Sequence, residues 1–265
     1  MSLFPPLLKY WRGKKGLSQL DLGLAAEVSS RHISFLETGR AKPSKEMILT
    51  LATTLDVPLR EQNTMLSVAG FEPVFEEPSL SENKALDRVI KLMFKKHEPY
   101  PMVVMTAAYD LINTNATAQK LIQEFIANPA AISVPLNLYD ALFNPELMRP
   151  FVKNWESFAK KMLSRIHREA ILNTHDTRFA ELADKLLSYP GVPSEWRVPD
   201  FTETNDPFLT IELENDHYAL SFLSIITTFS APQNITAQEL LLETFFPSND
   251  QTEALCLQLK KDRFD

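Results

Sequence analysis

The sequence predicts an α+β protein of two domains: an all-helical N-terminal domain of five short helices, and a larger domain in which helices flank an antiparallel sheet. Three observations lead to this prediction. The chain has 265 residues, 45% of them apolar and 23% charged, which is enough for two separate cores. Helix starts recur throughout the first 70 residues. After Met102 the hydrophobic period changes from helical to alternating.

Five helix starts lie within these first 70 residues. Leu7, Leu8 and Trp11 give an opening helix its apolar side. The later starts are marked by an N-cap serine or by a proline in the first turn, at Ser18, Ser29, Ser44 and Pro58. Asp21 stands three residues after Ser18, the spacing of a capping box. The helices that follow Ser18 and Ser29 are joined so closely that they must cross steeply, as in a helix-turn-helix.

Charge is unevenly distributed along the chain. The net charge is −7, yet residues 1–45 carry eight basic and three acidic side chains, so they sum to +5 and the remainder to −12. A basic N-terminal region in an otherwise acidic protein is expected when that region binds a polyanion.

The stretch SQLDLGLAAEVSSRHISFLETGRAKPS, from Ser18 to Ser44, resembles the Xre and phage-repressor helix-turn-helix family at nearly every position. Two positions depart from the family pattern. Gly23 stands where the family usually has alanine, and it keeps the close contact between helices at a cost of about 0.5–1 kcal/mol in helix propensity. Glu27 replaces the usual turn glycine, so we expect either a left-handed conformation there or a slightly different turn.

The resemblance implies binding to double-stranded DNA, with the second helix of the motif in the major groove. Gln19 and Ser30 are expected to contact phosphates or bases at the two helix N-termini. Four residues are expected on the face that reads base edges: Arg31, His32, Ser34 and Phe35. Arg40 and Lys42, in the following loop, are expected to hold phosphates.

The segment rich in proline, glutamate and serine from Gly70 to Asn83 predicts a domain boundary. We therefore expect a DNA-binding domain at residues 1–72, a linker at 73–83 and a second domain at 84–265. The second domain begins with a helix over 84–96, broken by HEPYP at 97–101. Strands are expected at 102–105 and 109–112, followed by a helix from Asn115 to Phe125 and one long amphipathic helix over 145–172.

The rest of this domain is predicted to hold another helix, a hairpin and a final helix. Asp176 caps a helix that ends at Tyr189-Pro190-Gly191, and residues 208–213 and 218–229 alternate as two strands of a hairpin. The segment 236–246 suits either a helix or a strand. Ser248 is expected to cap the last helix, which ends at Lys260-Lys261.

Five long strings extend the resemblance to the whole chain: HEPYP (97–101), YDLINTN (109–115), LFNPELMRPFVKNWESFAKKML (142–163), SYPGVP (188–193) and TTFSAPQNITAQELLLETFFP (227–247). Together with the N-terminal helix-turn-helix domain, these strings make the chain similar to the MmyB-like regulators. Those regulators join an Xre-type DNA-binding head to a PAS-like ligand-binding domain. The resemblance implies a sheet curled around an apolar pocket, a fatty-acid-like ligand and a homodimer.

Residues from three parts of the second domain are candidates for this pocket. The apolar candidates are Leu111, Phe151, Phe158, Met162, Leu223 and Ile225. The polar candidates are Asn115, Asn154 and Arg165, of which Arg165 is suited to hold a carboxylate as a forked pair. For any single one of these apolar residues an ordinary core position is the simpler interpretation, and for Arg165 a surface salt bridge.

Several kinds of chemistry have no support in the sequence. No glycine lies between Gly70 and Gly191, which excludes a glycine-rich phosphate loop there. Cys256 is the single cysteine, so paired-cysteine zinc sites and disulfides are excluded. No GxSxG motif or His pair around a glutamate occurs. We expect no enzyme activity, no cofactor or metal, no membrane span and a cytoplasmic location. The alternatives are an orphan DNA-binding protein whose second domain only dimerises or recruits a partner, and an enzyme with a DNA-binding head.

Overall fold

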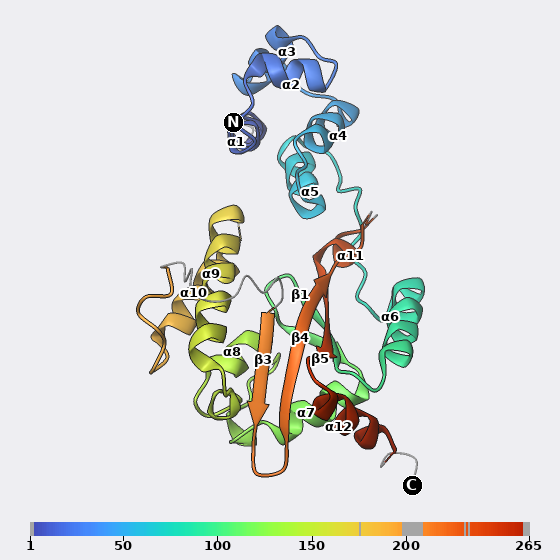
Figure 1. Cartoon of the computed structure of the whole chain (residues 1–265). Helices are drawn as coiled ribbons and strands as arrows, with labels where there is room; N and C mark the ends of the chain where they lie inside the picture. Colours follow the sequence, from blue (N-terminus) through green and yellow to red (C-terminus); the bar gives the residue numbers. More distant parts are fainter. Residues whose placement is uncertain (1–2, 175, 198–208, 231, 233, 262–265) are drawn as a thin grey trace. The chain divides into compact units, whose positions relative to one another are not determined.

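The computed structural model describes residues 3–174, 176–197, 209–230, 232 and 234–261. The chain forms two compact units (Figure 1). The first comprises residues 1–84 together with 229–238, and the second comprises residues 85–228 and 239–265. The expected boundary near residue 84 is therefore present, but a short segment from far along the chain belongs to the first unit.

The first unit contains the five expected helices. They are α1 (Phe4–Lys14), α2 (Gln19–Ala25), α3 (Ser30–Glu37), α4 (Lys45–Thr54) and α5 (Leu59–Val68). The side chains of Ser18, Ser29 and Ser44 cap the helices that follow them, and Ser18 forms the expected capping box with Asp21. Pro58 is the N-cap of α5 rather than a residue of its first turn. The helices enclose a core that includes Leu8, Trp11, Leu22, Ile33, Leu36 and Ile48.

The turn between α2 and α3 explains both departures from the family pattern. Glu27 has a φ of 56°, so it takes the left-handed conformation. Gly23 is buried under this turn, and a Cβ atom there would lie 2.5 Å from the carbonyl oxygen of Val28. Because real Cβ atoms do not approach backbone so closely, an alanine at position 23 would push the turn away from α2.

The segment 73–83 and the distant segment 229–238 both pack onto α5. Asn63 holds the first through hydrogen bonds from the amides of Val74 and Phe75 to its Oδ1. Helix α11 (Ile235–Glu239) begins in the second segment. Its Gln238 Oε1 accepts the Leu59 amide at 2.7 Å, at the start of α5, where Pro58 offers no side-chain cap. The stretch 73–83 is therefore part of the first unit rather than a free linker.

The second unit is an α+β domain built on five strands: β1 (Met102–Thr106), β2 (Leu111–Thr114), β3 (Leu209–Glu214), β4 (Ala219–Thr227) and β5 (Leu240–Pro247). The described residues also form the helices α6 (Lys84–His97), α7 (Ala116–Glu124), α8 (Leu138–Phe143), α9 (Trp155–Leu172), α10 (Thr177–Ser188) and α12 (Asp250–Lys261). The strand order is β2-β1-β5-β4-β3, and every neighbouring pair is antiparallel. This confirms the predicted fold class.

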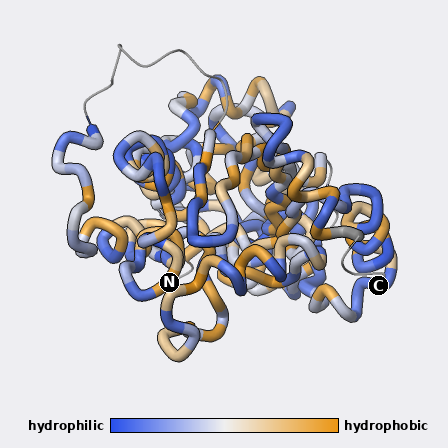
Figure 2. Tube along the Cα trace, turned by 60° about the horizontal axis from the view of Figure 1, so that its bottom comes forward, coloured by the Kyte–Doolittle hydropathy of each residue, from blue (hydrophilic) through white to orange (hydrophobic). Residues whose placement is uncertain are grey.

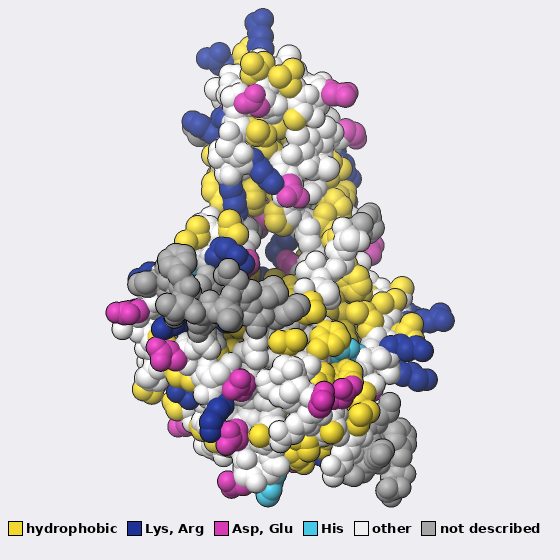
Figure 3. Space-filling view, viewed as in Figure 1, with side chains coloured by type: hydrophobic (Ala, Val, Ile, Leu, Met, Phe, Trp, Pro, Cys, Tyr) yellow, Lys and Arg dark blue, Asp and Glu magenta, His cyan; other side chains and the backbone are white. Residues whose placement is uncertain are grey.

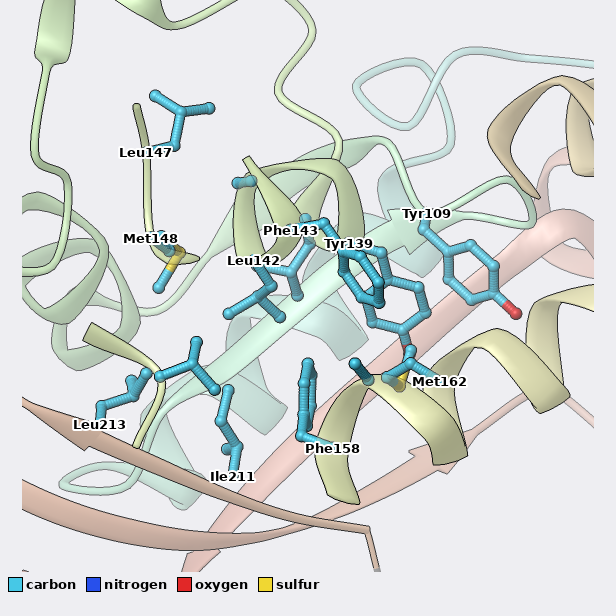
Figure 4. Close-up of a cluster of buried hydrophobic side chains, with 14 of the residues drawn as sticks. Tyr109, Tyr139, Leu142, Phe143, Leu147, Met148, Phe158, Met162, Ile211 and Leu213 are labelled. Atoms are coloured by element: carbon cyan, nitrogen blue, oxygen red, sulfur yellow. The ribbon is translucent and has the colours of Figure 1, made fainter. Parts of the chain in front are cut away.

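The sheet carries its main core on one face. Val103, Met105, Ile211, Leu220 and Phe222 point to this face and pack with α8, α9 and α10 in a single cluster. Figure 4 shows residues of this cluster, with Leu142 and Met148 facing Ile211 and Leu213, and Tyr109 and Tyr139 lying beside Met162 of α9. Along the trace in Figure 2, hydrophilic and hydrophobic residues alternate, as expected of elements that bury one side.

Three predicted elements need correction, and one helix was missed. The expected long helix over 145–172 is broken: a 3-10 turn at Arg149–Phe151 contains Pro150, and α9 begins only after Asn154. The second strand begins at Leu111, because Tyr109 turns with a φ of 70°. Helix α8 was not predicted. The final helix is capped by Asn249, whose Oδ1 accepts the Thr252 amide, and not by Ser248.

The segment 236–246, for which the sequence allowed either a helix or a strand, contains parts of both. Residues 235–239 form the single turn of α11, and β5 follows from Leu240 without a loop. Asn115 and Asp176 cap α7 and α10 as expected. Phe208 and the side chains of Lys260 and Lys261 lie outside the residues that the structure describes.

Candidate functional site

The first candidate site is the exposed face of α3 in the helix-turn-helix of the first unit. Helix α2 ends at Ala25 and α3 begins at Ser30, so four residues join them. Ile33 and Leu36 are fully buried, which fixes the rotation of α3 and turns the intervening residues outward. Figure 3 shows Lys and Arg side chains projecting from the end of the unit where α2 and α3 lie.

The predicted base-reading residues share this outward side. Arg31 is exposed, and its guanidinium lies 5.3 Å from the centre of the Phe35 ring, so the two side chains stack. Ser30, His32 and Ser34 are half-buried on the same helix. Arg40 and Lys42 are exposed in the loop that follows. All of these side chains are therefore at least partly accessible to solvent.

Gln19 has a structural contact that the sequence did not indicate. Its Nε2 donates to Glu37 Oε2 at 2.8 Å, and Arg12 donates to both carboxylate oxygens of Glu37, at 2.6 and 3.0 Å. The Glu37 side chain is 3% exposed. Burial alone would raise the pKa of Glu37, but the hydrogen bonds from Arg12 and Gln19 outweigh burial and lower it. This network joins α1, α2 and the end of α3, and so sets the position of the recognition helix.

The second candidate site is an apolar cavity in the second unit, against the core face of the sheet. It has a volume of about 50 Å³, and its walls are apolar: Pro101, Val103, Ala118, Leu121, Ile122, Leu138, Leu142, Met148, Ile211, Leu213, Phe222 and Phe245. Strands β1, β3, β4 and β5 supply its floor, and α7 and α8 supply its cover. The space is partly open, and because its walls carry no polar groups it suits apolar groups better than water.

A polar cluster lies on the same face of the sheet as this cavity, although none of its residues lines the cavity. Glu243 of β5 is the cross-strand partner of Val103, which lines the cavity, and its side chain points to the same face. Glu243 is 2% exposed, and the Ser224 hydroxyl donates to its Oε1. Its Oε2 has no hydrogen-bond partner, and neither has the fully buried hydroxyl of Tyr139. Unsatisfied buried polar atoms are uncommon in folded proteins, so two in one place need an explanation.

Arg165 and Tyr109 complete the cluster. The Arg165 guanidinium lies 5.8 Å from the Tyr109 ring centre, and its charge acts on the Tyr109 hydroxyl. The Tyr109 and Tyr139 rings are packed at 4.2 Å between centroids. No carboxylate lies within 4 Å of Arg165 among the described residues, so the alternative of a surface salt bridge is not seen there.

Burial controls the protonation of this cluster. It raises the pKa of Glu243 to about 7, against the hydrogen bond from Ser224 and the nearby charge of Arg165. It also raises the pKa of Tyr139 well above its ordinary value. Burial lowers the pKa of Arg165, but Tyr139, Tyr109 and Glu243 outweigh it, and the net shift is upward. Arg165 is therefore a permanent cation, whereas Glu243 is poised between its two forms near neutral pH.

Two of the three predicted polar pocket residues form hydrogen bonds with backbone groups instead of lining a pocket. Asn115 accepts the amides of Met102 and Ala118 and donates to the Tyr100 carbonyl, so its carboxamide is satisfied by backbone groups. Asn154 lies before α9 rather than within it, and it bonds to the backbone of Thr210 and Glu212 on β3. Both side chains fix the frame of the domain, and neither converges with Arg165.

The predicted apolar residues divide between the two faces of the sheet. Phe158 and Met162 are in the main core, with Leu111 and Phe151 partly buried against it. Leu223 and Ile225 point to the opposite face, because side chains alternate along a strand and their neighbour Phe222 points to the core. Phe222 and Leu220 occupy the core positions that the sequence analysis assigned to Leu223 and Ile225.

The sequence analysis missed Glu243, Tyr139 and Ser224. A partial signal exists, since Glu243 interrupts the apolar run LLLETFF, where a central strand would carry only apolar residues. The open hydrogen bonds of Glu243 and Tyr139 arise only from packing between separate elements. Among the described residues, no group of three or more His, Cys, Asp or Glu could hold a metal ion. In the same part of the chain, no helix is long and apolar enough to span a membrane.

Comparison with known proteins gives two family matches. Residues 86–259 match the model of the MmyB-like transcription regulator ligand binding domain, and residues 8–62 match a helix-turn-helix model. No protein of curated function matches the chain significantly. One solved structure, titled "Structure of an RNA-binding Light-Oxygen-Voltage Receptor", has 10% identity and a TM-score of 0.29, over 99% of this chain and 64% of that chain. A similarity of this size supports no argument, and the chain spans 64% of that receptor's length.

Proposed function

Since this chain belongs to the family of MmyB-like transcription regulators, a DNA-binding head joined to a ligand-binding domain, we propose that its second unit senses an apolar, fatty-acid-like small molecule. The observations that support the proposal are a cavity lined only by apolar side chains and, in the same core, the unpaired polar atoms of Glu243 and Tyr139. Such a site suits an amphiphile with a hydrocarbon tail and one polar head group. Arg165, which has no carboxylate partner, is the group to hold an acidic head.

Native mass spectrometry of gently purified protein tests the ligand, followed by organic extraction of any bound molecule. We expect a stoichiometric adduct of lipid-like mass. Protein without an adduct that also fails to bind added fatty acids would contradict ligand sensing and favour the orphan regulator. The same spectra report the oligomeric state, which we propose to be a homodimer.

DNA binding is proposed to use the outward side of α3 and the loop after it. A dimer would place two such helices on half-sites about 34 Å apart. Arg31→Ala is expected to weaken operator binding by about 1–3 kcal/mol if Arg31 contacts a guanine edge. Arg40→Ala is expected to weaken binding to all sequences alike and to reduce the salt dependence.

Fluorescence anisotropy with duplex DNA at several salt concentrations measures both effects. Lys153→Ala removes a positive charge from the second unit and serves as the matched control. Equal affinities of all three variants would contradict the proposed DNA contacts. The coupling between ligand and DNA is proposed to be about 1–3 kcal/mol. An operator affinity that saturating ligand leaves unchanged would contradict this coupling.

A further inference from the structure

The sheet of the second unit has an outer face, which is the face opposite to the main core. Because cross-strand partners share a face, the strand register gives its apolar residues: Met102, Val104, Leu223, Ile225, Leu242 and Phe246. Met102 and Val104 on β1 are buried, whereas Ile225 and Phe246 are each 38% exposed. The described residues therefore leave an apolar half of this face, over β4 and the end of β5, partly uncovered.

Helix α6 borders the uncovered half and is strongly basic. Its last residue, His97, meets the Phe246 ring edge-on at 5.1 Å between centroids. Residues 84–97 hold five basic side chains and one acidic. The exposed side chains form two stripes at helical spacing, an apolar one of Ala85, Val89 and Leu92 and a basic one of Lys84, Arg88, Lys91 and Lys95. Figure 3 shows hydrophobic side chains gathered over β5 and α6, with Lys and Arg along the outer edge of α6.

The other border of the uncovered half is acidic. Strand β3 lies on the side of the sheet away from α6 (Figure 1). Its Glu212 and Glu214 point to the outer face, since Ile211 points to the core. Residues 209–218, which include β3 and the turn after it, hold three acidic residues and no Lys or Arg. The outer face thus has an apolar centre between a basic and an acidic border.

A two-fold axis along the strands would bring the two borders together. Such an axis turns a second copy face to face with the first, exchanges the α6 side with the β3 side and keeps the height along the strands. Phe246, against which α6 ends, is level with Leu223, and Leu223 is two residues along β4 from the partner of Glu212. Lys95 and Lys96 therefore reach nearly the height of Glu212. An axis across the strands would instead set α6 against α6, where like charges repel.

We infer that the outer face of the sheet is the docking surface for a second copy of this chain, with the two apolar halves packed together and α6 of each copy paired by charge with β3 of the other. The inference rests on the homodimer of the proposed function, to which it adds the surface. A face with both signs of charge around one apolar centre is complementary to itself, as an isologous interface requires. It also has the apolar core and polar rim of protein interfaces.

Sedimentation velocity of the full chain, at about 1 to 100 µM, tests the inference. We expect the wild type to form a dimer. Ile225→Asp places a charge in the apolar centre, so the dissociation constant of the dimer should rise about 100-fold or more. Ile171→Asp makes the same change at an exposed position on α9, outside the proposed surface, and it should dimerise as the wild type does.

Charge reversal tests the pairing of α6 with β3. The variant with Lys95→Glu and Lys96→Glu, and the variant with Glu212→Lys, should each raise the dissociation constant about tenfold. The three substitutions together should return it to within about threefold of the wild type, because the pairs are then restored with opposite sign. Circular dichroism checks that each variant is folded. A purely structural role of these side chains does not predict the restoration.

Cross-linking of the wild type decides the question if a variant does not fold. A carbodiimide joins amines to carboxylates in direct contact, and it is applied to a mixture of isotope-labelled and unlabelled protein. We expect a cross-link from Glu212 to Lys95 or Lys96 that joins a labelled to an unlabelled chain. A wild-type dimer without this cross-link, or one that Ile225→Asp and the charge reversals leave unchanged, overturns the inference but not the homodimer. A wild type that stays monomeric at about 100 µM contradicts both, and leaves the proposed ligand and DNA contacts intact.

Discussion

Glu37 in the first unit and Glu243 in the second are both buried carboxylates, yet their surroundings differ. Glu37 receives three hydrogen bonds, from Arg12 and Gln19, and its pKa is lowered. Glu243 receives one, from Ser224, and keeps an unpaired oxygen beside the unpaired Tyr139 hydroxyl. A satisfied buried network is part of the architecture, whereas an unsatisfied one has the hydrogen-bonding capacity that a ligand can use. The comparison separates a structural polar site from a proposed binding site within one chain.

Breaking the satisfied network should have the largest effect. Arg12→Met leaves Glu37 buried without its cation, and we expect the first unit to lose about 3–5 kcal/mol of stability. Hydrogen exchange of the α3 amides measures this loss. Lys15→Met removes an exposed pair with Asp56 from the same region and should cost less than about 1 kcal/mol. Equal effects of the two variants would contradict a special role for the buried network.

Replacing the unsatisfied carboxylate should have the opposite sign and depend on pH. The folded-state pKa of Glu243 is about 7, above its value of about 4.5 in an unfolded chain. The folded state therefore binds more protons in this range, and the wild type loses stability as pH rises from about 4.5 to 7. Glu243→Gln should be more stable than the wild type by about 3 kcal/mol at pH 8, and nearly equal to it at pH 4.5. Urea unfolding of ligand-free protein at both pH values checks this, and a pH-independent difference would contradict it.

A smaller change tests the third hydrogen bond to Glu37. Gln19→Ala removes a neutral donor to a buried carboxylate, which should destabilise the first unit by about 1.5–3 kcal/mol, at the lower end because Arg12 remains. The same hydrogen-exchange measurement applies. If Gln19 also contacts DNA, the variant binds operator more weakly than its loss of stability explains.

The smallest effect is expected from Tyr139→Phe in the absence of ligand. This variant removes a buried hydroxyl that has no partner, so we expect a gain of about 1 kcal/mol in stability. Thermal unfolding measures the stability difference between Tyr139→Phe and the wild type, once without ligand and once with decanoic acid bound. The gain should disappear or reverse when ligand is bound. A loss of stability in the free protein would mean that the hydroxyl is satisfied.

Much of the first unit could be predicted from sequence because its signals are local. The caps Ser18, Ser29 and Ser44 each act within three residues, and the left-handed Glu27 lies in a turn that the motif defines. The second unit depends on longer-range effects. The break at Pro150 was missed because the apolar spacing continues across it, although proline is itself a local signal.

The ligand site was harder to predict for a related reason. Leu223 and Ile225 are as apolar as Phe222, and only the strand register decides which of them faces the core. Arg165 could be selected from its helix, but Tyr139 and Glu243, which act on it electrostatically, come from an unpredicted helix and an ambiguous segment. Unsatisfied hydrogen bonds are a property of the packed structure, so no pattern in the sequence shows them.

The inclusion of residues 229–238 in the first unit has a consequence for how the protein is made. At about 5–20 residues per second, the ribosome needs roughly 10–30 s to pass from residue 84 to this segment. During that interval the Leu59 amide lacks Gln238, and the carbonyls of Glu76 and Pro78 lack Ile235 and Thr236. The nascent DNA-binding head is completed only after most of the sensor has been synthesised. A chain interrupted before residue 229 thus carries a first unit that lacks these three hydrogen bonds.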